Sequence, residues 1–301
     1  MKNNILFVSA ILSLLAFSAC DEDSFSQVVE VDIPEHESKL VFNALVNSSD
    51  TTISVLLSSS QGILSDPLYS VFANGQVRLL KDGVLVENLS FDADNSLKFI
   101  TNGVLELGQG LYRLEAEVDG YPAIAAEQEM PKPVEINKAI YEPRGAITPD
   151  GDRADEIQVT FTDPVGEENF YAIRAFYEGK YWDGIDTFYY ENEIYLETFD
   201  QFARIGNEFQ IILTDNAFDG ESYTLSAYTY STYFPTEGDG KIKAVLYSLS
   251  RDAYYYDLSL NQYYQANGNP FAEPVTVHEN VENGHGIFAL RQVTERVADV
   301  E

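Results

Sequence analysis

An aromatic block between residues 177 and 195 carries the side chains with the clearest binding chemistry in this sequence. Its rings stand among glycines and carboxylates, and they are Tyr177, Tyr181, Trp182, Phe188, Tyr189, Tyr190 and Tyr195. A flat apolar ring with a polar rim recognises amphipathic ligands such as sugars and peptides. We expect a ligand site formed by Tyr181, Trp182, Tyr189 and Tyr190, with Trp182 displayed near the turn that Asp183-Gly184 predicts. The alternative is a core with cross-strand aromatic pairs.

Oxygen ligands suited to a metal ion gather between residues 148 and 156. Asp150, Asp152 and Asp155 lie at close spacing around Gly151, and a hard cation such as calcium takes about six to eight oxygen ligands. The late bidentate glutamate of an EF-hand is missing from the segment. The oxygen ligands make these three aspartates a candidate calcium site, although their spacing is not the full EF-hand pattern, and an Asp-Gly turn between strands is the alternative. We expect no other cofactor.

Motifs for hydrolytic chemistry are absent from the sequence. Its three histidines are His36, His278 and His285, and none lies in a zinc-protease motif. There is no nucleophile elbow and no phosphate-binding glycine loop. We interpret Gly284-His285-Gly286 as a C-terminal loop, with an exposed imidazole as the alternative, and we expect a strand near Gly286–Leu290. With 49 acidic residues, chance pairs of carboxylates are unavoidable, so a glycosidase dyad is not inferred. We expect a protein that is not an enzyme, with a glycan hydrolase as an alternative.

Cys20 is the only cysteine in the chain of 301 residues. It follows a charged head at Lys2 and an apolar run from Ile5 to Phe17. This pattern predicts a signal peptide over residues 1–19. The apolar run is too short for a membrane-spanning helix, which needs about 20 apolar residues. The end of the run, Phe17-Ser-Ala-Cys20, resembles a lipobox. We expect acyl chains such as palmitate on Cys20, and these would hold the chain at a membrane. An ordinary signal peptide is the alternative.

Residues 20–38 form a polar, acidic segment that we interpret as a tether. Asp21-Glu22-Asp23 follows the cysteine directly and is similar to the surface-export signal of Bacteroidota lipoproteins. We therefore expect a lipid-anchored protein of the outer membrane that faces the cell exterior. An anchor that faces the periplasm is the alternative.

The net charge of −31 bears on possible partners. Nucleic-acid binding requires a basic face, so nucleic acid is excluded as a partner. A hydrophobic content of 45% excludes a disordered chain, and 20 tyrosines and 18 phenylalanines against 2 methionines indicate a β-rich fold. Beyond residue 17 there is no further long apolar run, so the lipid is the only membrane contact that we expect.

Short apolar runs with period-two alternation predict strands throughout residues 39–130, at the spacing of a β-sandwich. Asp82-Gly83 predicts a hairpin within them. The stiff segment Pro131-Lys-Pro133 marks a boundary, and residues 134–301 form a second β-rich domain. We therefore expect a mostly β protein of two sandwich-like domains, of the immunoglobulin, fibronectin or transthyretin type.

One helix is expected near the C-terminus, over residues 250–266. Ser250 is suited to the N-cap and Asp252 to the first turn, and Asn267-Gly268 indicates the end. The residues that fall on one helical stripe, which we expect to be buried, are Ala253, Tyr256, Leu260, Tyr263 and Tyr264.

Four segments resemble a known family. They are Leu40-Val-Phe-Asn-Ala-Leu-Val46, Val77-Arg-Leu-Leu-Lys-Asp-Gly83, Asn269-Pro-Phe-Ala-Glu-Pro274 and Asn280-Val-Glu-Asn-Gly-His-Gly-Ile-Phe288. With the lipobox, they are similar to the Bacteroidota lipoproteins of the domain of unknown function 4249. This resemblance implies an outer-membrane lipoprotein, often encoded near a TonB-dependent transporter. It implies no reaction, ligand or site residue.

These observations predict a non-catalytic surface lipoprotein that works with a TonB-dependent transporter in ligand capture or uptake. A structural or adhesive surface protein without a soluble ligand is the alternative.

Overall fold

The computed structural model describes residues 35–62, 70–94, 96–206, 210–230, 240–269 and 271–300. The chain divides into two compact units, Met1–Glu37 and Ser38–Glu301, and every strand described lies in the second. The predicted signal peptide and Cys20 lie outside the described residues. Within the described ranges, no helix has the length and apolar character needed to cross a membrane.

The described residues form two β-sheets and one α-helix, α2 (Arg251–Ala266), so the predicted mostly β fold with a helix near the C-terminus is confirmed. The larger sheet has 13 strands. In order across it lie β12 (Ala203–Ile205), β13 (Ile211–Thr214), β10 (Phe170–Trp182), β15 (Lys241–Leu249), β16 (His285–Val297), β1 (Leu40–Asn47), β2 (Ser54–Ser59), β5 (Lys98–Ile100), β4 (Val84–Asp92), β3 (Gln76–Lys81), β6 (Leu111–Glu117) and β7 (Ile124–Glu129), with β11 (Thr187–Ile194) beside β10. The smaller sheet contains β14 (Ser222–Thr229), β9 (Arg153–Thr162), β8 (Ile136–Ile147) and β17 (Asp299–Val300), and a 3-10 helix, η2 (Asp215–Ala217), precedes β14.

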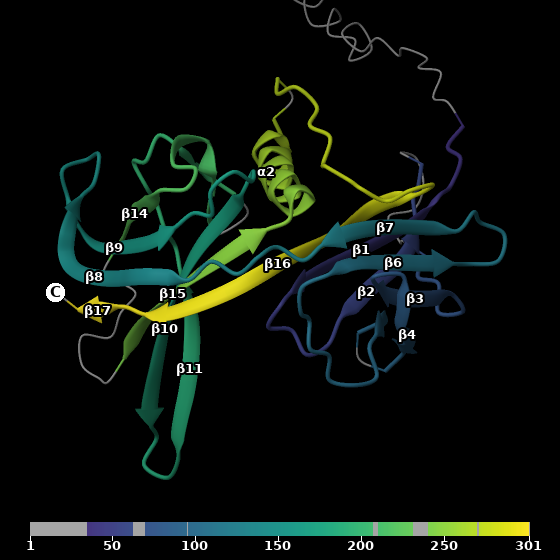
Figure 1. Ribbon diagram of the computed structural model, residues 1–301, viewed down its shortest axis with the longest axis horizontal. Coiled ribbons are helices and arrows are strands. Elements are labelled where there is room, and N and C mark those ends of the chain that lie inside the picture. The colour runs from purple at the N-terminus through teal and green to yellow at the C-terminus, as the bar shows by residue number, and fades with distance from the viewer. Residues whose placement is uncertain are drawn as a thin grey trace, which may run out of the picture. The chain divides into compact units, whose positions relative to one another are not determined.

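Strand β16 pairs with strands from both halves of the chain (Figure 1). Its first part pairs in parallel with β1, and its second part pairs antiparallel with β15. The two parts meet at Arg291, which is the register partner of Asn47 on β1 and of Leu249 on β15. The predicted boundary at Pro131–Pro133 lies between β7 and β8. Strand β16 therefore pairs with one strand that precedes this boundary, β1, and with one that follows it, β15.

The start of β16 corrects one prediction. His285 lies in this strand beside β1 instead of in a loop, and the strand expected near Gly286–Leu290 is confirmed. A Cβ on Gly286 would lie 1.9 Å from the backbone oxygen of Phe42, and one on Gly284 would lie 2.6 Å from that of Leu40. Gly286 also has a φ of +112°, which disfavours other residues. The two glycines are therefore explained by the close approach of the β1 backbone.

The N-terminal core takes its side chains from alternate positions of the strands that surround it. Strand β1 buries every second residue from Leu40 to Val46, and β6 does the same from Tyr112 to Ala116. The buried cluster also includes Phe288 of β16. The β3–β4 turn at Asp82 and Gly83 has φ values of 50° and 76°, which confirms the predicted hairpin.

The sheet around β10 and β15 is covered on both faces. On one face, Ile173 and Leu246 pack in a core with Phe161 of the smaller sheet. On the other face, Phe170 and Val245 pack with residues of α2. Because both faces are covered, β10 and β15 read as nearly continuous apolar runs where they pass between these layers.

Helix α2 begins and ends where the sequence predicts. The Ser250 side chain accepts a hydrogen bond from the N–H of Ala253, and the helix ends at Ala266, before Asn267. The predicted buried stripe is partly wrong: the buried residues are Ala253, Tyr254 and Asp257, whereas Tyr263 and Tyr264 are exposed. Asp257 lies inward because Arg291 of β16 pairs with it there.

Candidate functional site

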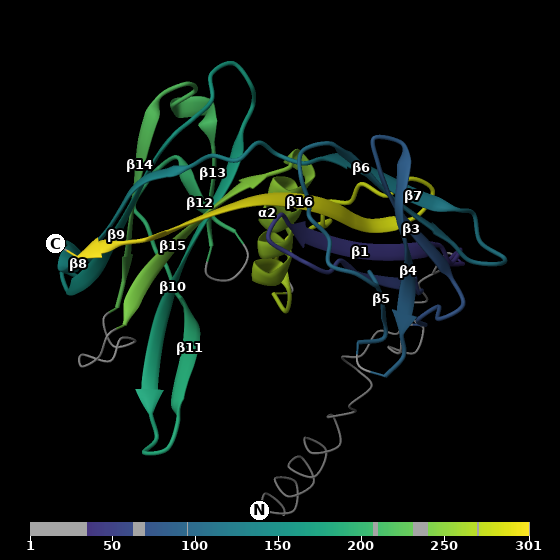
Figure 2. The same cartoon turned by 60° about the horizontal axis from the view of Figure 1, so that its bottom comes forward.

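The β10–β11 hairpin positions the aromatic block. Pairing between β10 and β15 extends to Glu178 and Lys241, whereas pairing between β10 and β11 continues to Trp182 and Thr187. In the described part of the chain, the β10 residues beyond Glu178 are thus paired with β11 alone. Figures 1 and 2 both show this hairpin extending away from the rest of the sheet.

A short turn closes the hairpin, as Asp183-Gly184 predicts. The Asp183 carboxylate accepts hydrogen bonds from the N–H groups of Ile185 (2.8 Å) and Asp186 (2.9 Å). These bonds, with the Asp186 bond the larger cause, lower the pKa of Asp183 below its ordinary value. Gly184 has a φ of +102°, a conformation that favours glycine.

The four predicted ligand residues lie on two opposite faces of the hairpin. Tyr181 pairs with Phe188, and Gly179 pairs with Tyr190, so Tyr181 and Tyr190 share one face. On that face, the rings of Tyr181 and Phe188 stack with centroids 5.2 Å apart and planes 18° apart. The ring of Tyr190 contacts that of Tyr181, with centroids 6.2 Å apart. This face therefore carries a cross-strand aromatic cluster, which is the alternative that the sequence also allowed.

Trp182 and Tyr189 lie on the opposite face, where Lys180 is the register partner of Tyr189. Their exposed fractions are 70% and 81%. Trp182 directly precedes the turn residue Asp183. The structure thus places Tyr181 and Tyr190 on one face of the hairpin and Trp182 and Tyr189 on the other, so it does not gather all four side chains on one surface.

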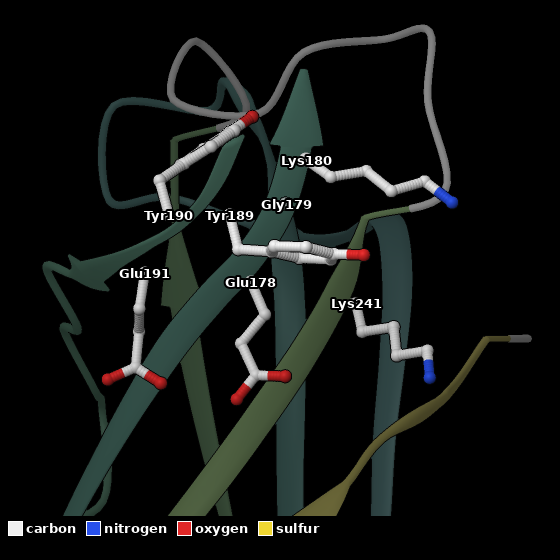
Figure 3. Close-up of a pocket in the computed structure, with 7 residues that line it drawn as sticks. All are labelled: Glu178, Gly179, Lys180, Tyr189, Tyr190, Glu191 and Lys241. Carbon is white, nitrogen blue, oxygen red and sulfur yellow. The ribbon is translucent and has the colours of Figure 1, made fainter. Parts of the chain in front are cut away.

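A hollow of about 480 Å³ lies beside Tyr189. Its lining residues come from β10, β11 and the start of β15, and they are Glu178, Gly179, Lys180, Tyr189, Tyr190, Glu191 and Lys241. In Figure 3 the Tyr189 ring lies between the side chain of Lys180 and those of Glu178 and Lys241. The sequence predicted Tyr189 and Tyr190 as ligand residues. It did not predict which charged residues lie around them, because that depends on how the strands pair.

Lys243 holds the carboxylates of this hollow in place. Its ammonium lies 3.0 Å from Glu178, 2.6 Å from Glu191 and 3.5 Å from Glu295. Burial opposes the charged form of Lys243, but the hydrogen bonds to Glu191 and Glu178 outweigh it and raise the pKa of this lysine above its ordinary value. The hydrogen bond from Lys243 lowers the pKa of Glu178. Both groups therefore remain charged at neutral pH.

The predicted calcium residues lie in and after the β8–β9 turn. Asp155 is buried, and its carboxylate accepts hydrogen bonds from the Tyr141 hydroxyl (2.6 Å) and the Arg144 N–H (2.8 Å). Asp150 and Asp152 are exposed, and Gly151 has a φ of +86° in the turn. Calcium at these aspartates stays a prediction, and the geometry gives Asp155 a structural role in this hairpin.

A different set of carboxylates lies close together among the described residues. Oxygens of Asp163, Asp215 and Asp219 approach within 4.8 Å of one another. Asp163 accepts hydrogen bonds from the Tyr171 hydroxyl and the Gly220 N–H. Burial raises the pKa of Asp163 above its ordinary value. Because these oxygens already accept hydrogen bonds from the chain, we assign the set to structure.

Sequence reasoning did not find the cluster around Asp252. Its carboxylate contacts His278 Nε2 at 2.7 Å and accepts hydrogen bonds from Gln128 Nε2 at 2.5 Å and Asn280 Nδ2 at 3.0 Å. A histidine with a carboxylate is an arrangement that acid–base catalysis uses. Here the amides occupy the carboxylate as well, so the cluster links β7, α2 and the segment before β16. Asp252 in the first turn was the only local signal.

A family model described as "Domain of unknown function (DUF4249)" matches residues 27–296. The chain belongs to this family. No curated protein matches it. The match includes α2 and the β10–β11 hairpin, and of the strands it leaves out only β17 and the last residue of β16, so the hairpin and the hollow are parts of the DUF4249 domain.

Proposed function

We propose that this DUF4249 protein is a surface-exposed outer-membrane lipoprotein, anchored through Cys20, that works without catalysis beside a TonB-dependent transporter in ligand capture or uptake. The observation that carries this proposal is the β10–β11 hairpin, which extends beyond β15 with aromatic rings exposed on both faces.

The hairpin is suited to contact with another molecule. Trp182 and Tyr189 leave large apolar surfaces exposed, and aromatic residues are enriched at protein interfaces and at hot spots within them. An isolated two-stranded hairpin is marginally stable in water. Here the ion pairs of Lys243 with Glu178 and Glu191 hold the two strands at the base of the hairpin, and the stacked rings of Tyr181 and Phe188 hold them near its turn. Such a hairpin presents its rings in a fixed arrangement, which lowers the entropic cost of binding.

A role without catalysis is supported by how the charged groups are used. Asp252 and His278 resemble an acid–base pair, but Gln128 and Asn280 bind the same carboxylate. Glu178 and Glu191 contact Lys243. These interactions position the carboxylates as structural groups and hydrogen-bond acceptors.

Purification from native outer membranes tests this function. A tagged full-length chain should retain a transporter barrel after gentle detergent extraction. Replacing both Tyr181 and Trp182 with serine should reduce the retained barrel, because loss of one interface hot spot costs about 2 kcal/mol or more. The matched control replaces two exposed tyrosines of α2, Tyr263 and Tyr264, with serine and should retain the barrel.

Repeated absence of a barrel with the wild-type chain would overturn the proposal. Unchanged ligand uptake together with lost surface attachment in the Tyr181 and Trp182 variant would favour a structural or adhesive protein instead.

We also propose that the two β-rich parts of the chain are β-sandwiches of the immunoglobulin, fibronectin or transthyretin type. Buried side chains of β1 and β6 meet in one core with Phe99 of β5, as they would between the two layers of a β-sandwich. The smaller sheet and the β10–β15 region share the second core in the same way.

A further inference from the structure

We propose that the hollow beside Tyr189 binds an uncharged oligosaccharide, with the Tyr189 ring as a stacking platform and Glu178, Glu191 and Lys241 as partners for its hydroxyl groups. This inference rests on the proposed function and names the ligand class that the protein captures.

The platform is the first part of the argument. Tyr189 is 81% exposed, and its ring lies along the wall of the hollow (Figure 3). The C–H groups on one side of a sugar ring form a flat apolar surface, which an aromatic face removes from water. At the same time, the sugar's hydroxyls remain at the edge of the ring, where polar partners reach them.

The polar groups around the ring are the second part. The hollow is lined by two carboxylates, Glu178 and Glu191, and by two ammonium groups, Lys180 and Lys241. A carboxylate only accepts hydrogen bonds and an ammonium only donates them, whereas a hydroxyl does both. A wall that carries acceptors and donors side by side therefore fits a ligand with several hydroxyl groups.

The charge balance is the third part, and it selects an uncharged ligand. Lys243 contacts Glu178 and Glu191 from within the sheet, and Glu295 contacts the same lysine. With Lys180 and Lys241, this gives equal numbers of cations and anions around the hollow, in a chain with a net charge of −31. An acidic polysaccharide meets no net positive charge here and is repelled by the rest of the protein.

The size of the hollow agrees with this ligand class. Its volume of about 480 Å³ lies within the range of small-ligand sites, about 300 to 1,000 Å³. Gly179 contributes to the shape: a Cβ there would lie 2.5 Å from the Tyr190 ring, so a side chain at this position would displace that ring.

Affinity gel electrophoresis of the full chain, purified in detergent, tests the proposal. The gels contain dextran, a mixed-linkage β-glucan, a mannan or polygalacturonate, so that three neutral polymers are compared with one acidic polymer. We expect at least one neutral polymer, and not polygalacturonate, to retard the wild-type chain. Tyr189→Ala should weaken this binding by about tenfold or more, and Tyr189→Phe should retain it because the ring is kept.

One further variant tests the polar groups around the ring. Lys241→Ala should weaken binding of the neutral polymer, since it removes a donor from the hollow. The controls are Tyr264→Ala on α2 and Lys138→Ala on β8, both exposed and outside the hollow, and they should bind as the wild type does. Circular dichroism checks that Tyr189→Ala keeps the fold, as its exposure predicts.

Three outcomes would overturn the proposal: no retardation by any neutral polymer, stronger retardation by polygalacturonate, or wild-type retardation of Tyr189→Ala. A transporter barrel that still co-purifies in these cases would leave the proposed function standing without this ligand class. Loss of the barrel together with normal glycan binding would instead contradict the transporter role.

Discussion

Asp257 of α2 and Arg291 of β16 form an ion pair in the interior, with Arg291 Nη2 2.8 Å and 2.9 Å from the two carboxylate oxygens. The Asp257 side chain is 0% exposed and that of Arg291 is 12% exposed. Arg291 is also the residue at which β16 changes its partner from β1 to β15. The pair therefore fixes α2 over the point where the two parts of the larger sheet meet.

Removing one partner of this pair should destabilise the fold strongly. Asp257→Ala leaves the Arg291 guanidinium buried without its counterion, and such a change costs about 3 to 5 kcal/mol. Urea unfolding followed by circular dichroism should show a lower free energy of unfolding. The control is Lys132→Ala, which removes an exposed ion pair with Glu167 and should cost less than about 1 kcal/mol.

A double variant refines this prediction. Asp257→Leu combined with Arg291→Met replaces the pair with apolar side chains and should recover much of the loss, because no charge is left buried alone. If Asp257→Ala were as stable as the wild type, the pair would have no role in holding α2.

Gly286→Ala should be among the most damaging single substitutions in the chain. Its Cβ would lie 1.9 Å from the Phe42 backbone oxygen, and the required φ of +112° is unfavourable for alanine. The β1 and β16 backbones would have to separate, so we expect a loss of about 3 kcal/mol or more. Thermal unfolding measures it, with Gly103→Ala as the control because nothing lies within 4 Å of that Cβ. Equal stability of both variants would contradict the close approach.

Local features of the fold were predictable, and distant contacts were not. Ser250 at the N-cap and Asp82-Gly83 in the hairpin follow from chemistry within a few residues. By contrast, Ser48 and Val293 form a hydrogen bond across 245 positions, and no local pattern indicates which strand lies beside β1. The buried stripe of α2 was partly wrong because it assumed that only apolar residues face inward, whereas Asp257 faces Arg291.

In the candidate site, too, local features could be predicted from the sequence and contacts between distant residues could not. Exposed rings at Trp182 and Tyr189 follow from composition and the Asp183-Gly184 turn. Their separation from Tyr181 and Tyr190 follows from strand alternation, once the segment is known to form one hairpin. Lys243 could not be placed at the hollow from the sequence, because its contacts with Glu178 and Glu191 depend on the β10–β15 and β10–β11 registers.

The Asp252 cluster should make the stability depend on pH in the acid range. Burial favours the protonated form, but the hydrogen bonds from His278, Asn280 and Gln128 outweigh it and lower the pKa of Asp252. The cluster therefore stabilises the fold above the unfolded-state pKa, about 3.9, and this contribution is lost as the pH falls through the lower folded-state pKa. Urea unfolding between about pH 5 and pH 2 should show a smaller decrease in stability for Asp252→Asn than for the wild type. An equal decrease would show that this carboxylate is not linked to folding.

Lipidation of Cys20 is expected to hold the protein in the membrane fraction. Cys20→Ser removes the thiol that receives the acyl chains, and two or more chains are needed for stable anchoring. Labelling with an alkyne analogue of palmitate should mark the wild type and not the variant, and the variant should lose its membrane association. Ser24→Ala is the matched control and should remain labelled. Label on the Cys20→Ser chain would exclude this attachment site.

The acidic residues after Cys20 should decide on which side of the outer membrane the protein lies. Replacing Asp21, Glu22 and Asp23 with their amides removes the charges of the expected export signal and leaves Cys20 unchanged. We expect the variant to stay lipidated and in the outer membrane, but to become protected from a protease added to intact cells. The control replaces Glu35 and Glu37 with glutamine, which lowers the charge of the tether by the same kind of change farther from the cysteine. It should remain accessible to the protease. Protection of the wild type itself would favour an anchor that faces the periplasm.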